Sequence, residues 1–111
     1  MKVSPLLAAA AVASFAFSLP AAAVDADAAL KLTKESGCTK CHAVDKDKKG
    51  PAYKATAAKY KGKPDAEAKV MDVLTKSPKI KMSDGTEEEH KAVNTKDVAQ
   101  VKNLAQWILA Q

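Results

Sequence analysis

The stretch Cys38-Thr39-Lys40-Cys41-His42 decides how the rest of the chain is interpreted. Its two thiols stand three positions apart, and a histidine follows the second thiol directly, which is the C-x-x-C-H pattern. This spacing suits two thioether bonds to one haem, and it places the histidine beneath the iron as an axial ligand. The pattern therefore predicts one covalently bound haem c, with Cys38 and Cys41 as tethers and His42 as an iron ligand.

A C-x-x-C pair also occurs in redox dithiols, disulfides and zinc sites. A thioredoxin-like dithiol needs a βαβ pattern around the motif, and the sequence has none. A zinc site needs four ligands, or three and a water, from Cys38, Cys41, His42 and the distant His90. Cys41 and His42 are adjacent, which is poor geometry for chelating one small ion. The motif therefore favours haem attachment, and a redox dithiol, a disulfide and a zinc site are the alternatives.

The first 23 residues have the features of a secretory signal peptide. Lys2 forms a short positive region, residues 6–17 are an apolar and small-residue run, and small residues fit cleavage after Ala23. A run of about a dozen residues is short for the ~20 that span a bilayer, although an uncleaved anchor is the alternative. We expect a signal peptide over 1–23 and a periplasmic domain over 24–111, with no stable membrane insertion after cleavage.

The mature chain has few large apolar side chains with which to build a hydrophobic core. Both phenylalanines lie in the leader, and about 88 residues remain after cleavage. Domains of this size are marginal on apolar burial alone and usually need a staple. A haem bonded at several points would supply that staple, so we expect the haem-free chain to be poorly folded. The aromatic residues that remain are Tyr53, Tyr60 and Trp107.

Helical patterns separated by glycine and proline cover most of the mature chain. Gly37 ends the first helix, and Pro51 is placed for the first turn of the second. The last helix has the broadest apolar face, with Trp107 on its edge. No strand pattern is visible, so the expected class is all-α, with one domain. The expected helices cover 25–36, 52–60 and 65–75 and run from Asn94 or Thr95 onward, with an irregular loop over 77–94.

The sixth ligand of the iron decides the function. Met82 lies in the irregular loop, where a methionine has little reason to be present for packing, and a thioether there would raise the reduction potential. Met71 lies within the third helix and is most simply a core residue. His90 follows three glutamates and is expected to be exposed. We predict Met82, with His90, Met71 and an open site as alternatives.

The chain resembles the short class I c-type cytochromes of the bacterial periplasm. That resemblance implies about four helices around one haem, with the first and last helices packed together. It also implies that the backbone carbonyl of Pro51 accepts a hydrogen bond from His42, which fixes the ring as an outer-shell partner does. The residues that carry the resemblance are Gly37, the 38–42 motif, 50–52, 57–62, Met82 and 104–108.

The charge pattern indicates the partners. Removing the leader takes away only Lys2, so the mature chain keeps 17 lysines against 13 acidic residues and has no arginine. Lysines gather over 39–63 and before Met82, and this positive surface would steer docking to acidic redox partners. The alternative is a surface that is merely solvated. Missing arginine and few aromatics argue against nucleic acid.

These observations predict a one-electron carrier rather than an enzyme. The alternative is a haem sensor or small-gas-binding protein with a weak or open sixth site. A peroxidase would need an open site and a distal acid–base group, for which only His90 is available.

Overall fold

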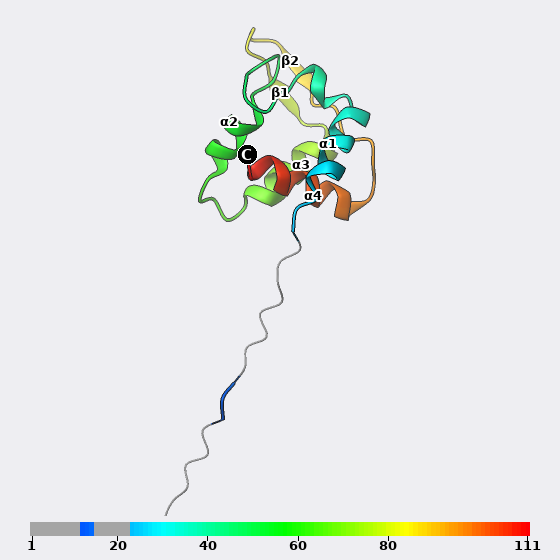
Figure 1. Ribbon diagram of the computed structural model, residues 1–111. Helices are drawn as coiled ribbons and strands as arrows, with labels where there is room; N and C mark the ends of the chain where they lie inside the picture. Colours follow the sequence, from blue (N-terminus) through cyan, green and yellow to red (C-terminus); the bar gives the residue numbers. More distant parts are fainter. Residues whose placement is uncertain (1–11, 15–22) are drawn as a thin grey trace, which may run out of the picture.

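The computed structural model describes residues 12–14 and 23–111 (Figure 1). The predicted signal peptide therefore lies almost entirely outside the described residues. Within them, no helix has the length and apolar character needed to cross a bilayer. The elements are α1 (Ala26–Glu35), the short 3-10 helix η1 (Cys38–Lys40), α2 (Tyr53–Tyr60), α3 (Ala66–Lys76), β1 (Lys79–Lys81), β2 (Glu87–Glu89) and α4 (Val98–Leu109).

Helix α4 is the hub of the core. It packs against α1, α2 and α3, as the centre of Figure 1 shows, and Leu104 and Ala105 at its middle are fully buried. Trp107, predicted on the edge of the apolar face of this helix, is buried as well and packs in the core. The predicted all-α class with packed first and last helices is confirmed. The other buried apolar residues of this core are Ala29, Leu32, Tyr53, Val70, Leu74, Val93, Val101 and Ile108.

Two side chains join the start of α1 to the side of α4. Asp25 caps α1 by accepting a hydrogen bond from the backbone N–H of Ala28 at 3.0 Å. Asn103 of α4 accepts from the Asp25 N–H and donates to the Asp25 carbonyl, both at 2.8 Å. This reciprocal pair joins two residues that are 78 positions apart in sequence and so fixes the crossing of α1 and α4.

The segment predicted as an irregular loop contains a short antiparallel hairpin. Lys79 pairs with Glu89, Ile80 with Glu88 and Lys81 with Glu87. The prediction that the chain has no strand is therefore wrong in this detail. Strands of three residues with mostly charged side chains carry too few apolar positions to show a period of two. The hairpin is instead supported by opposite charges that face each other across the two strands.

The last helix begins later than predicted, at Val98 rather than at Asn94 or Thr95. The reason is local, because Asp97 has an extended backbone and its side chain accepts from the N–H of Ala99 at 2.9 Å. Asp97 is therefore the cap and not a residue of the first turn. The other helix limits agree with the predicted ones to within one residue.

Leu104→Ala should destabilise the folded protein by about 2–5 kcal/mol, because it removes a fully buried side chain at the hub. Denaturant unfolding of the mature, haem-loaded protein measures the change in the free energy of unfolding. Val98→Ala on the same helix is the matched control, since Val98 is 68% exposed and should change stability by about 0.5 kcal/mol or less. Equal effects of the two variants would contradict α4 as the centre of the core.

Candidate haem site

The two cysteines lie on one tight turn between α1 and the following loop. Gly37 takes a left-handed backbone conformation with φ 74°, which bends the chain out of α1. The N–H groups of Cys41 and His42 then both donate to the Cys38 carbonyl, at 3.1 and 2.9 Å. The thiols of Cys38 and Cys41 are both free and half-buried, and burial raises the pKa of the Cys38 thiol. One turn thus presents both thiols and the histidine together.

The ring of His42 is fixed from the backbone. Its Nδ1 lies 2.7 Å from the carbonyl oxygen of Pro51, and a protonated Nδ1 donates to that oxygen. In the neutral ring such a hydrogen bond selects the tautomer with its proton on Nδ1, and Nε2 is then the nitrogen that can bind a metal. The structure therefore brings together the histidine and the proline that the sequence paired through a resemblance.

The loop after the motif folds tightly around His42. The N–H of Gly50 donates to the Cys41 carbonyl at 2.7 Å, which returns the chain to the motif. A Cβ added at Gly50 would collide with Cε1 of His42 and lie 2.8 Å from its Nδ1. Glycine is required here because the backbone touches the face of the imidazole, and not because of an unusual φ.

An aromatic stack connects His42 to the core. The rings of His42 and Tyr53 are stacked with centroids 5.4 Å apart, and Tyr53 meets Trp107 edge-on at 5.3 Å. Burial raises the pKa of Tyr53 to about 12, and its hydroxyl is buried with no partner among the described residues. A buried hydroxyl without a partner costs free energy, so this oxygen is suited to a polar group that the protein chain does not itself supply.

His90 lies inside the site. It follows β2 directly, is half-buried, and its ring centroid lies 6.1 Å from that of His42 with 40° between the planes. The prediction of an exposed His90 is wrong, because its N–H donates to the Pro78 carbonyl at 2.8 Å and holds it at the base of the hairpin. Burial and the neighbouring His42 lower the pKa of His90, which favours its neutral form.

The two methionines are in different surroundings. Met82 stands at the tip of the hairpin and is half-buried, and its N–H donates to the Thr86 carbonyl at 2.7 Å. Met71 is half-buried on α3 and packs against the hydrophobic core, as predicted for a core residue.

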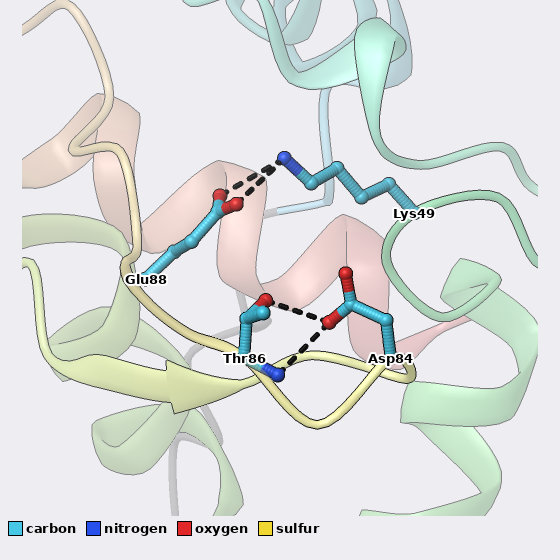
Figure 2. Close-up of polar contacts among 4 residues, drawn as sticks. All are labelled: Lys49, Asp84, Thr86 and Glu88. Carbon is cyan, nitrogen blue, oxygen red and sulfur yellow. Dashed lines mark hydrogen bonds and ion pairs between the residues drawn. The ribbon is translucent and has the colours of Figure 1, made fainter.

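A polar clamp joins the hairpin to the loop after the motif (Figure 2). Lys49 donates to both carboxylate oxygens of Glu88, at 3.0 and 2.9 Å. The hairpin turn is closed by Asp84, which accepts from the N–H and the hydroxyl of Thr86. Both members of the Lys49–Glu88 pair are about half exposed, so solvent screens their attraction and its contribution to stability is small, yet the pair marks where the hairpin lies.

The residues present fit a haem and do not fit a zinc ion. The part of the chain that the structure describes has no group of three or more His, Cys, Asp or Glu side chains placed to hold a metal ion. The two thiols and the free nitrogen of His42 fit covalent haem attachment, and the Tyr53 hydroxyl and Nδ1 of His90 are buried polar atoms that lack a protein partner. Sequence reasoning missed Tyr53 and the contact of Gly50, although Gly50-Pro51 was itself a visible signal.

Comparison with known proteins finds one matching family and several similar chains. The family description "Cytochrome c" matches residues 26–111. Cytochrome c-551 of Azotobacter vinelandii is 35% identical over 79 residues, which are 71% of this chain and 92% of that protein. The crystal structure of the class 1 cytochrome MtoD from Sideroxydans lithotrophicus ES-1 is 54% identical, with a TM-score of 0.76 over 79% of this chain and 97% of that one. Nitrosomonas europaea cytochrome c552 is 33% identical, with a TM-score of 0.60 over 73% and 96% of the two chains.

Gly50→Ala should destabilise the haem-loaded protein by about 1–3 kcal/mol, because the new methyl group collides with the His42 ring. Denaturant unfolding, followed in the haem absorption band, measures the loss. Gly62→Ala is the control, since its backbone conformation is strained for alanine but its added Cβ meets nothing within 4 Å. Because only the Gly50 substitution touches His42, only Gly50→Ala should also alter the haem spectrum. A spectrum that changes in Gly62→Ala and not in Gly50→Ala would contradict the close contact with His42.

Proposed function

Because this chain belongs to the cytochrome c family and, as a monohaem electron carrier, binds one haem c covalently, we propose that it shuttles single electrons between protein partners in the periplasm. The observation that carries the proposal is the His42 ring, fixed through Nδ1 by Pro51 beside two free thiols. The bound haem supplies an iron that alternates between the ferric and ferrous states. No substrate bond is made or broken, so we propose a carrier and not an enzyme.

The residues of the chain set the conditions for fast transfer. Cys38 and Cys41 tether the haem, and His42 ligates the iron with a ring that Pro51 and Gly50 prevent from turning. A second strong axial ligand keeps the coordination alike in both redox states. The sequence predicts Met82 for this second position.

We propose that partners dock on the lysine-rich surface around the motif. Some of its lysines are occupied, because Lys49 pairs with Glu88 and Lys54 with Asp45. Among the described residues, Lys40 and Lys46 are exposed and form no ion pair, so their charge is available to an acidic surface. Such charges mainly raise the rate of encounter at low salt.

We propose export with cleavage after Ala23, leaving Val24 as the first residue. Asp25 caps α1 and is joined to Asn103, so cleavage at this point would leave the helix cap intact. Mass spectrometry of the protein from the periplasmic fraction should give the mass of residues 24–111 plus one haem. A mass that includes residues 1–23 would contradict cleavage.

The carrier function predicts a ferrous haem that does not bind carbon monoxide at neutral pH, because both axial positions are filled. Absorption spectra of the reduced holoprotein before and after carbon monoxide provide the measurement, together with a reversible redox titration that should follow a one-electron curve. Rapid carbon monoxide binding with a high-spin ferric spectrum would overturn the carrier in favour of a gas-binding protein.

The docking proposal predicts that electron transfer to an acidic redox protein slows as salt rises. Lys40→Glu with Lys46→Glu should slow it several-fold at low salt and leave the rate at high salt nearly unchanged. Stopped-flow absorption measures the rate. Lys96→Glu, exposed and outside the 39–63 cluster, is the matched control, and an equal effect there would contradict docking at the motif.

A further inference from the structure

His90 stands where a second axial ligand would stand. Its ring centroid lies 6.1 Å from that of His42. An imidazole nitrogen lies about 2 Å from a bound first-row metal ion, and the ring centre lies about 1 Å further back, so two rings on opposite sides of one ion have centres about 6 Å apart. The observed separation is therefore the one that two histidines need to share a single metal ion between them.

We propose that His90, rather than Met82, supplies the sixth ligand of the haem iron, giving a carrier with two histidine ligands. The inference deepens the proposed function and rests on it, since it names the second ligand of the same haem. A histidine ligand in place of a methionine lowers the reduction potential, because methionine is the ligand that raises it.

The backbone holds His90 firmly in this position. On one side its N–H donates to the Pro78 carbonyl at 2.8 Å, and three residues later the N–H of Val93 donates to the Leu74 carbonyl of α3 at 2.9 Å. The segment that bears His90 is thus tied both to the first strand and to the core. The ion pair between Lys49 and Glu88 adds a further link (Figure 2). Glu88 stands two residues before His90, and Lys49 lies on the loop that follows His42.

The hairpin places Met82 away from His90. Pro78 stands opposite His90 at the base, whereas Met82 stands opposite Thr86 at the tip. Met82 is four positions further along the chain than Pro78, which is about 13 Å in an extended strand. Both positions are on the half-buried face of the hairpin with Ile80. If His42 and His90 both bind the iron, its two axial positions are taken and Met82 is not a ligand.

The unpaired ring nitrogen of His90 also supports its role as an iron ligand. Its Nδ1 is buried and has no partner among the described residues. A histidine that only packed in the core would be expected to satisfy both ring nitrogens, because each buried nitrogen left unpaired costs about 1–3 kcal/mol. The Tyr53 hydroxyl lies in the same region, so the two buried side-chain atoms that lack a partner among residues 12–14 and 23–111 both lie near His42.

The test uses the mature holoprotein and two variants with their spectra and potentials. Ferric wild type should be low-spin, should lack the near-infrared charge-transfer band that methionine sulfur gives with ferric haem, and should show the electron paramagnetic resonance of two imidazole ligands. Met82→Leu, which conserves volume, should leave spectrum and potential unchanged. His90→Met should gain the near-infrared band and a higher potential, or, if the new side chain falls short, become high-spin.

Loss of a near-infrared band in Met82→Leu, with His90→Ala spectrally unchanged, would overturn the inference while leaving the electron carrier intact. A high-spin wild type that binds carbon monoxide would overturn both. Should His90→Met fail to fold, His90→Ala with added imidazole provides the second route. Imidazole should restore the low-spin spectrum of that variant, and failure to restore it in a folded, haem-loaded protein would count against His90.

Discussion

The constraint on which the structure depends is the fixed ring of His42. Pro51 holds its Nδ1 at 2.7 Å, the backbone of Gly50 presses on its face, and Tyr53 stacks against it at 5.4 Å. The ring therefore has one free nitrogen and one permitted direction. Because the two thiols lie on the turn that ends at the same histidine, one short stretch of backbone would hold both thioether bonds of a haem and the histidine that would ligate its iron.

The rest of the chain supports that arrangement from two sides. On one side α4 gathers α1, α2 and α3 into the apolar core, and Trp107 extends this core to Tyr53 and so to His42. On the other side the hairpin, clamped by Lys49 and Glu88, brings the ring of His90 to within 6.1 Å of that of His42, centroid to centroid. A core of this size is marginal by itself, and a bound haem would join its two halves. The contacts that stabilise the fold around His42 and His90 are thus the same ones that would hold the haem for electron transfer.

The sequence allowed the haem motif and the helices to be predicted because each has a short-range cause. C-x-x-C-H is a spacing, and Gly37, Asp25 and the apolar period of α4 act within a few residues. The hairpin could not be foreseen, since its strands are mostly lysine and glutamate and carry too few apolar positions to show a period of two. His90 was misjudged for the same reason, because three glutamates before it indicate solvent, whereas the hydrogen bond to Pro78 turns it inward. The start of α4 was misplaced because Asp97 could serve equally as a cap or a first-turn residue.

The most direct measurement is iron X-ray absorption of the ferric holoprotein, since its fine structure separates sulfur from nitrogen neighbours of the metal. The account in which His42 and His90 face each other across the haem predicts a first shell of nitrogen only. A sulfur neighbour at the longer distance typical of metal–sulfur bonds would contradict it and assign the sixth position to methionine.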